Sequence, residues 1–133
     1  LEDGIEERNT IAGNLAAFGR APAAEHRVLP SDASPASFWI THPANAVRDN
    51  VAAGAQGWGF WYALPEHPTG MSATTAEWPR RTPLGSFERN VAHSNRSGGL
   101  NVDDGPRADG VTETTNYAPR AVPGAESPAV LAE

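Results

Sequence analysis

A six-residue phrase occurs three times in this chain of 133 residues, as IAGNLA at 11–16, VRDNVA at 47–52 and FERNVA at 87–92. Each copy has an apolar residue, two variable residues, an asparagine, a second apolar residue and an alanine. Short β segments cannot bury an apolar face alone, whereas stacked copies share one continuous core. The repetition therefore predicts a coiled β fold in which successive copies lie on top of one another.

A second phrase follows the last two asparagines, as GFWY at 59–62 and GLNV at 99–102. One circuit from Phe38 to Phe60 takes 22 residues, and the next, from Phe60 to Leu100, is longer. We assign the excess to a surface loop over residues 63–83. A further loop is expected over residues 19–36, because Pro and small polar residues interrupt the apolar pattern there.

Composition and charge exclude several partners and chemistries. Twelve Pro and thirteen Gly with 39% hydrophobic residues suit a loop-rich β domain. The net charge of −6 leaves no basic stripe for nucleic acid or an anionic membrane surface. The absence of Cys excludes disulfides, thiolate catalysis and Cys-based zinc sites. No run approaches the roughly 20 apolar residues of a membrane-spanning helix, so we expect no membrane span.

The pattern changes after the last repeat. From Asp103 onward Ala, Pro, Gly, Thr and acidic residues dominate without a strand pattern, as is typical of a linker. We therefore expect a β-helix segment over residues 1–104 and a low-complexity tail or linker over residues 105–133. The chain begins at Leu1 without Met or a signal-like segment, and we interpret it as a piece of a longer protein with upstream and downstream domains as partners.

The repeated asparagines predict a structural ladder. Asn14, Asn50 and Asn90 are expected at the same corner of successive coils, where their side-chain amides can hydrogen-bond along the stack. Asn also tolerates the left-handed backbone of a sharp corner. Because an inward amide ladder satisfies buried polar groups without a ligand, we favour a structural role for these residues.

Several motifs, taken in order, resemble a known family. They are LEDGIE at 1–6, FWITHPAN at 38–45, NVAAG at 50–54, GFWY at 59–62, HPTG at 67–70 and PLGSF at 83–87. They resemble the right-handed parallel β-helix region shared by fibrocystin-L, the cell migration-inducing hyaluronan-binding protein and the cell-surface hyaluronidase, with similar bacterial secreted relatives. The resemblance extends over residues 1–104 and fails over the tail.

The resemblance implies an all-β protein, a right-handed parallel β-helix of about four coils, with the two loops inserted and an irregular C-terminal tail. It further implies an extracellular or secreted location and a link to polysaccharide or glycosaminoglycan binding or depolymerisation. The matched motifs carry no catalytic residue of the family. Binding and catalysis therefore both stay open.

Aromatic residues are the first candidates for binding a sugar. Strand alternation sends Phe38 and Phe60 into the core, and Trp39 and Trp61 to a shared outer face. There the two indoles are either covered by the loops or form a platform on which a carbohydrate stacks. Trp58, at the start of the same aromatic strand, is the third candidate.

Carboxylates near the N-terminus are weak catalytic candidates. The aligned second phrases form one column just before the strand: Asp3, Ala36, Trp58 and Gly98. Asp3 and neighbouring Glu2 would then accept hydroxyl protons from a sugar stacked on Trp58. Hydrolysis needs a second carboxyl roughly 5 to 10 Å away, from another coil or loop. The alternative is that Trp58 packs beneath a loop and that the carboxylates are solvated.

Basic residues of the second loop suit a different chemistry. In a lyase, His67 would act as the base, and Arg80 or Arg81 would neutralise the developing charge. The adjacent pair Arg80 and Arg81 is also the best docking point for an acidic sugar, unless both are solvated loop residues. The four histidines match no metal-ligand spacing, and we expect neither a metal nor a cofactor.

From the resemblance and these residues together, we favour an extracellular segment that binds polysaccharide, such as a hyaluronan-like glycosaminoglycan, through the aromatic strand and the second loop. One alternative is a fragment of a polysaccharide-depolymerising enzyme of hydrolase or lyase type, and another is a structural spacer without a ligand. A carboxylate pair facing an open groove beside Trp58 would favour the enzyme. Outward tryptophans without such a pair would favour binding, and covered tryptophans the spacer.

Overall fold

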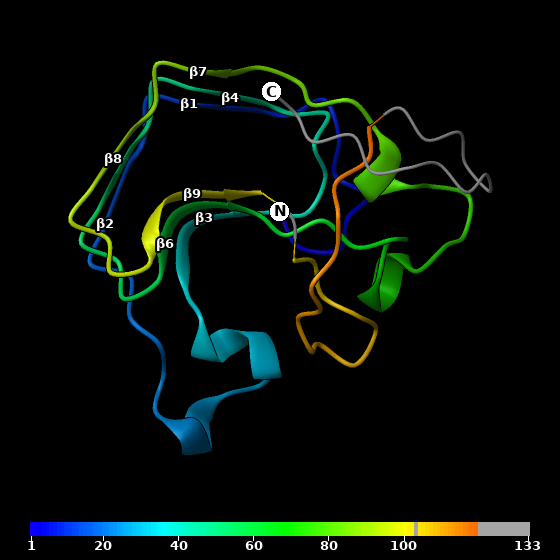
Figure 1. Cartoon of the computed structure of the whole chain (residues 1–133), viewed down its shortest axis with the longest axis horizontal. Helices are drawn as coiled ribbons and strands as arrows, with labels where there is room; N and C mark the ends of the chain where they lie inside the picture. Colours follow the sequence, from blue (N-terminus) through cyan, green and yellow to red (C-terminus); the bar gives the residue numbers. More distant parts are fainter. Residues whose placement is uncertain (103, 120–133) are drawn as a thin grey trace.

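Each copy of the asparagine phrase forms two short strands that meet at a corner. A computed structural model describes residues 1–102 and 104–119 of the chain (Figure 1). The second phrase forms a longer strand after each pair. The nine strands are β1 Thr10–Ala12, β2 Leu15–Ala17, β3 Ala36–Ile40, β4 Ala46–Arg48, β5 Val51–Ala53, β6 Trp58–Tyr62, β7 Phe87–Glu88, β8 Val91–His93 and β9 Gly98–Val102.

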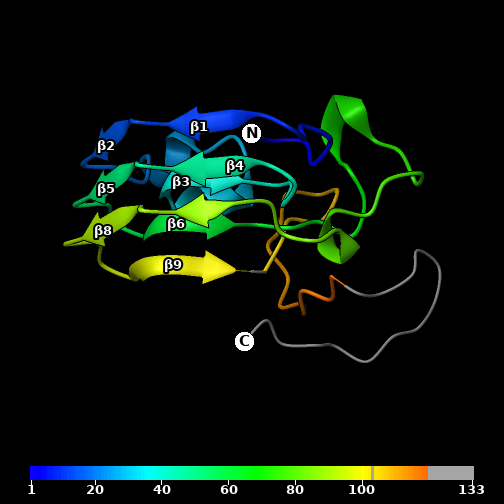
Figure 2. The same ribbon diagram turned by 90° about the horizontal axis from the view of Figure 1, so that it is seen from above.

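The strands form three parallel sheets, ordered β1-β4-β7, β2-β5-β8 and β3-β6-β9. Within each sheet the chain returns to the same position one circuit later, so Phe38 pairs with Phe60 and Phe60 with Leu100. Viewed from the side, the circuits lie as layers (Figure 2). The fold is therefore a parallel β-helix, as expected. The described residues give three strands to each sheet, not the four coils expected, because residues 1–9 lie beside the first circuit without forming a strand.

The core lies inside the coil and follows strand alternation. Phe60, Tyr62 and Ile40 are almost completely buried. The Phe38 and Phe60 rings stack with centroids 4.7 Å apart and planes 9° apart, because both occupy the same position of adjacent circuits. The Phe87 ring meets Phe60 edge-on at 5.2 Å. Identical positions in successive circuits thus supply one continuous apolar stack.

The side chains of the repeated asparagines are hydrogen-bonded along the stack. Asn14 Nδ2 donates to Asn50 Oδ1 at 2.9 Å, and Asn50 Nδ2 donates to Asn90 Oδ1 at 3.1 Å. Asn50 Nδ2 also reaches back to the Ile11 carbonyl at 2.8 Å. The backbone N–H groups of Asn14 and Asn50 donate to the same amide oxygens. The ladder therefore satisfies polar backbone groups at a buried corner.

The left-handed backbone of this corner belongs to the residue before each asparagine. Gly13, Asp49 and Arg89 have φ values of 69°, 58° and 50°. Arg89 also binds Asp49 across the stack, with Arg89 Nε 2.7 Å from Asp49 Oδ1. The asparagine side chain is thus reserved for the ladder, and the preceding residue takes the turn.

Sequence reasoning missed the amide contacts of two further asparagine side chains, those of Asn45 and Asn95, at other corners. Asn9 N donates to Asn45 Oδ1 at 2.9 Å, and Asn45 Nδ2 donates to the His42 carbonyl at 2.7 Å. Asn95 Oδ1 accepts from Ala55 N at 2.9 Å. Each of these asparagines lies just outside a strand. That position was an available signal, but assigning the residue to a turn does not by itself predict the hydrogen bonds of its side chain.

Both predicted loops are present, and each contains short 3-10 turns. Residues 19–35 hold η1 Ala24–His26 and η2 Pro30–Ala33, and residues 63–86 hold η3 Gly70–Ser72 and η4 Pro79–Arg81. Figure 1 shows the two loops on different sides of the coil, outside its wall. No helix within the described ranges is long and apolar enough to cross a membrane.

The expected tail at residues 105–133 needs correction in its first half. Tyr117 is only 8% exposed and belongs to the core cluster, and its hydroxyl donates to the Thr82 carbonyl at 2.9 Å. Ala118 N donates to the Arg80 carbonyl, and the Glu113 carboxylate accepts from Arg80. Residues 105–119 therefore pack against the second loop, because one buried aromatic ring outweighs a polar composition. The remainder of the predicted tail, 120–133, lies outside the described residues.

Replacing Asn50 should destabilise the stack strongly. Asn50→Ala removes a fully buried amide and leaves the Ile11 carbonyl without its donor, so the free energy of unfolding should fall by about 3 kcal/mol. Asn14→Ala, at the exposed end of the same ladder, should cost about 1 kcal/mol or less. Urea denaturation measures both values. Equal losses of unfolding free energy in the two variants would contradict a larger stabilising role for the buried Asn50.

Tyr117 offers a test of whether residues 105–119 belong to the folded unit. Tyr117→Ala should lower the free energy of unfolding by about 3 kcal/mol, since it empties part of the core. Tyr117→Phe, which loses only the hydrogen bond to Thr82, should cost about 1 kcal/mol. An unchanged urea midpoint in Tyr117→Ala would show that this segment does not dock.

His42 should make the free energy of unfolding fall as the pH drops through and below 6.5, its ordinary pKa. Burial lowers the pKa of His42, although Glu7, Glu77 and Glu6 oppose the shift. Below the ordinary pKa of 6.5 the unfolded chain binds a proton that the folded chain does not, so the free energy of unfolding falls as the pH is lowered. His42→Asn, which keeps an acceptor for Ala44 N, should flatten this slope in urea titrations. The exposed His26→Asn should leave it unchanged.

Candidate functional site

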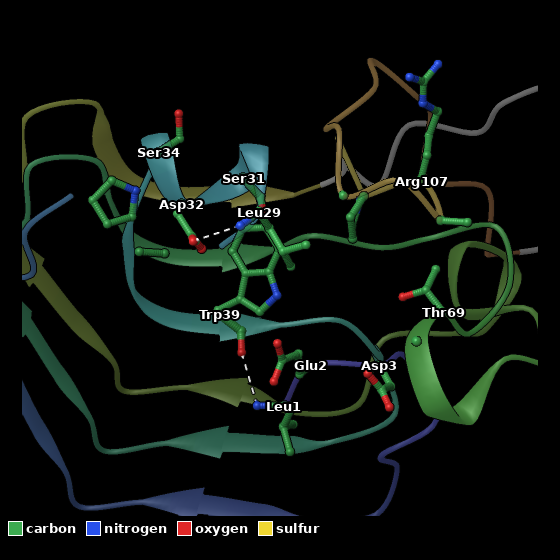
Figure 3. Close-up of a pocket in the computed structure, with 16 residues that line it drawn as sticks. Leu1, Glu2, Asp3, Leu29, Ser31, Asp32, Ser34, Trp39, Thr69 and Arg107 are labelled. Atoms are coloured by element: carbon green, nitrogen blue, oxygen red, sulfur yellow. Dashed lines mark hydrogen bonds between the residues drawn. The ribbon is translucent and has the colours of Figure 1, made fainter. Parts of the chain in front are cut away.

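A pocket of about 540 Å³ lies on the outer side of β3, where four separate segments meet. The N-terminal segment, the turn η2, the second loop and the segment around Arg107 each contribute to its lining (Figure 3). Its polar and aromatic lining includes Glu2, Asp3, Asp32, Trp39, Thr69 and Arg107. The site is therefore assembled by tertiary structure.

Trp39 forms the aromatic wall of this pocket. Strand alternation turns its side chain outward, while Phe38 and Ile40 face the core. In Figure 3 the indole lies between η2 on one side and Glu2 on the other. It is half-buried, so part of the ring is available to a ligand.

Trp61 and Trp58 form a packed row behind Trp39. The Trp39 and Trp61 rings meet at 5.0 Å and the Trp61 and Trp58 rings at 6.3 Å, both edge-on. The outer-face indoles were expected either to be covered or to form a stacking platform. Trp61 is only 4% exposed, so it is covered. Trp58 lies against Gly98, where an added Cβ would come within 2.4 Å of its ring. The row holds Trp39 in place from one side.

Asp3 joins the N-terminal segment to the second loop. Its carboxylate accepts from Ser72 Oγ at 2.9 Å, and its carbonyl accepts from Thr69 N at 2.8 Å. Gly70, with φ of 61°, lies so close that an added Cβ would be 2.8 Å from Asp3 Oδ1. Asp3 therefore reaches the pocket wall as a carboxylate that is already bonded on one side.

Glu6 positions Glu2 and Asp3, and sequence reasoning did not identify it. Its carboxylate accepts from the backbone N–H groups of Glu2, Asp3 and Gly4 at 3.0 to 3.3 Å. Partial burial raises the pKa of Glu6, but these hydrogen bonds outweigh that effect and the pKa is lowered. The available signal for such a turn was Gly4 with an acidic residue two positions after it.

Asp32 is the third carboxylate of the pocket and was also missed. Its Oδ2 accepts from Val28 N at 2.8 Å and Leu29 N at 3.0 Å. These backbone hydrogen bonds, from Leu29 first and then Val28, lower the pKa of Asp32. The carboxylate therefore stays ionised while it fixes the start of η2.

Arg107 is the guanidinium of the pocket. It belongs to a small antiparallel bridge formed by Pro106 and Thr112. Its Nη2 lies 2.8 Å from Asp109 Oδ2 and its Nε 3.3 Å from Asp109 Oδ1, so the charge is already paired. Sequence reasoning missed Arg107 because residues 105–133 were assigned to a tail.

The predicted column of Asp3 with Trp58 is wrong. The strand register aligns Ala36, Trp58 and Gly98, but Asp3 lies instead beside η3. Leu1 N donates to the Trp39 carbonyl at 3.4 Å, which places the N-terminal segment next to β3. The physical reason is the turn around Gly4, whose φ is 87° and which Glu6 closes. Glu2 and Asp3 thus face Trp39, not Trp58.

Arg80 and Arg81 lie outside the pocket. Arg80 contacts Glu66 and Glu113, and Arg81 contacts Glu66. Arg81 also lies over the Trp78 ring, 4.4 Å from its centroid. The contacts with Glu66 and Trp78 hold the second loop together, and the contact of Arg80 with Glu113 joins the loop to a later segment.

His67 also belongs to this loop cluster. Its ring is 4.1 Å from that of Trp78, and its Nδ1 is 2.8 Å from the Glu77 carbonyl. The structure therefore does not bring His67 together with Glu2 or Asp3 in one pocket. Within the described ranges, no three His, Cys, Asp or Glu residues are grouped so as to hold a metal.

Comparison with known proteins gives relatives over most of the chain. Fibrocystin-L of Mus musculus is 43% identical over 94 residues, which cover 71% of this chain and 2% of that protein. The cell surface hyaluronidase CEMIP2 of Homo sapiens is 36% identical over 132 residues, covering 79% and 9%. The cell migration-inducing and hyaluronan-binding protein of Mus musculus is 32% identical over 127 residues, covering 78% and 9%. The chain thus spans a small part of the length of these relatives.

Residues 1–100 match the family model described as CEMIP beta-helix. The repeat, the parallel sheets and these similarities agree with that match. The chain belongs to the CEMIP β-helix family.

Proposed function

We propose that this chain is an extracellular β-helix segment that binds polysaccharide in the pocket beside Trp39. The observation that carries the proposal is a partly exposed indole in a pocket lined by carboxylates and hydroxyls. A pyranose has an apolar face that an aromatic ring can cover and a rim of hydroxyls that carboxylates can bind. The two kinds of group meet in this pocket.

The size and construction of the pocket support a ligand-binding role. Its volume lies within the range of roughly 300 to 1,000 Å³ that small-molecule sites occupy. Asp3 and Asp32 are fixed by hydrogen bonds before any ligand arrives, so little ordering is left for binding. A preformed pocket of this kind fits a short part of a longer glycan.

The names of the relatives support the ligand class and the location. One relative is named a cell surface hyaluronidase and another a hyaluronan-binding protein. A hyaluronan-like glycosaminoglycan is therefore a candidate polymer, and an extracellular location is part of the proposal. A ligand role for Trp58, Trp61, Arg80 and Arg81 stays a prediction, since these residues lie outside the pocket lining.

Depolymerisation is the second candidate, because Glu2 and Asp3 both line the pocket. A glycosidase needs two carboxyls on either side of the bond that it cleaves. Glu2 or Asp3 on one side of Trp39, with Asp3 held by Ser72, and Asp32 on the other side are the candidates for this pair. We rank binding first because the indole and the fixed carboxylates suffice to explain it, whereas hydrolysis also requires a reacting water.

Replacing Trp39 should weaken glycan binding. Trp39→Ala removes the aromatic wall, and affinity for hyaluronan or neutral oligosaccharides should fall at least about tenfold, the effect of roughly 1.4 kcal/mol. Isothermal titration calorimetry measures the affinity without depending on indole fluorescence. Trp78→Ala, in the second loop and outside the pocket, is the matched control and should bind as the unchanged chain does.

A reducing-end assay on the same samples separates binding from cleavage. Saturable binding without new reducing ends supports a binding segment. If new reducing ends form with the unchanged chain but not with Asp3→Asn, hydrolysis would replace binding as the function. Unchanged affinity in Trp39→Ala, with the fold intact by circular dichroism, would overturn the choice of this pocket.

A further inference from the structure

The charge of the pocket is unbalanced in favour of carboxylates. Glu2, Asp3 and Asp32 line it, and Arg107 is its one lining guanidinium among the described residues. Asp109, just outside the lining, pairs with Arg107 through both carboxylate oxygens. The backbone nitrogen of Leu1, which also lines the pocket, donates to the Trp39 carbonyl.

The carboxylates come from two sides of the indole. Figure 3 shows Glu2 and Asp3 on one side of Trp39, and Asp32 on the other. Negative charge therefore flanks the indole on two sides. A ligand that stacks on Trp39 has carboxylates on both flanks.

A sugar with its own carboxylate would be repelled in this position. Like charges a few ångströms apart disfavour one another, and the effect is stronger in a partly desolvated pocket than in water. Arg107 would have to leave Asp109 before it could bind a sugar carboxylate in bidentate fashion. Among the described lining residues, no second cationic side chain offsets this cost.

An uncharged sugar meets complementary groups instead. Ionised carboxylates accept hydrogen bonds only, and sugar hydroxyls can donate them. The hydroxyls of Ser31, Ser34 and Thr69 also line the pocket and can both donate and accept. An amino sugar, whose ammonium group only donates, fits the same acceptors.

We infer that the pocket selects uncharged or amino-bearing sugar units and excludes uronate units. This inference rests on the proposed glycan-binding function and names the class of sugar that the site accepts. In a polymer that alternates uronates with uncharged, N-acylated amino sugars, the uncharged unit would occupy the pocket. The uronates would then lie outside it.

The test compares three tetrasaccharides of different charge on the unchanged chain. The probes are an N-acetylglucosamine tetramer, a glucosamine tetramer and a galacturonate tetramer, titrated by calorimetry at low ionic strength. The N-acetylglucosamine and glucosamine tetramers should bind at least tenfold more tightly than the galacturonate tetramer. Raising the salt concentration should narrow the gap, because screening weakens the repulsion.

Glu2→Gln provides the matched variant. Glu2 is exposed, and no described residue donates a hydrogen bond to its carboxylate, so the substitution should leave the fold intact. It should strengthen binding of the galacturonate tetramer severalfold relative to the N-acetylglucosamine tetramer, because Gln keeps an acceptor oxygen but loses the negative charge. Glu25→Gln, an exposed change of equal charge in η1 outside the pocket, should alter neither affinity.

The possible failures are distinguishable. If the galacturonate tetramer binds as tightly as the neutral one, charge selection is overturned and glycan binding stands. If none of the three binds, the proposed function falls, and the inference falls with it. If Glu25→Gln changes the affinities as much as Glu2→Gln does, the effect belongs to net charge and not to the pocket.

Discussion

The hydrogen bonds of the buried corner are the constraint on which the rest of the molecule depends. A chain that coils around a core bends at the corners of each circuit. A buried corner leaves backbone N–H and carbonyl groups away from water. Asn50 resolves this by accepting from the circuit before and donating to the circuits on both sides. Because each amide needs the next one in register, the ladder also fixes the spacing at which Phe38, Phe60 and Leu100 stack.

The rigid coil then serves as a base for irregular segments. β3 is the first strand of its sheet, and its outer face carries Trp39. Neither loop forms the pocket alone, since η2 contributes Asp32 and the second loop contributes Thr69. Hydrogen bonds of Asp3 with Ser72 and Thr69 hold the N-terminal segment against the second loop, and Glu6 closes the turn of that segment. Regular strands supply precision here, and the loops supply the chemistry.

Repetition made much of the fold predictable. The spacing of the asparagine phrases gave the strands, the shared corner and both loop positions, because stacked circuits must place equal residues at equal positions. Single contacts carried no such signal. Gly4 and Glu6 turn Asp3 away from its predicted column, and Tyr117, with the Arg80 contacts of its neighbours, draws residues 105–119 onto the body. A composition or an alignment of short phrases averages over such individual side chains.

For the candidate site, the sequence identified Trp39, Glu2 and Asp3 as chemically suitable but placed the carboxylates beside Trp58. It missed Asp32 and Arg107, which lie in segments without periodicity. The sequence by itself determined a repeated, parallel β coil with outward tryptophans, because periodic burial follows directly from periodic residues. Only the tertiary structure decided which carboxylates meet which indole, because that depends on contacts between segments far apart in the chain.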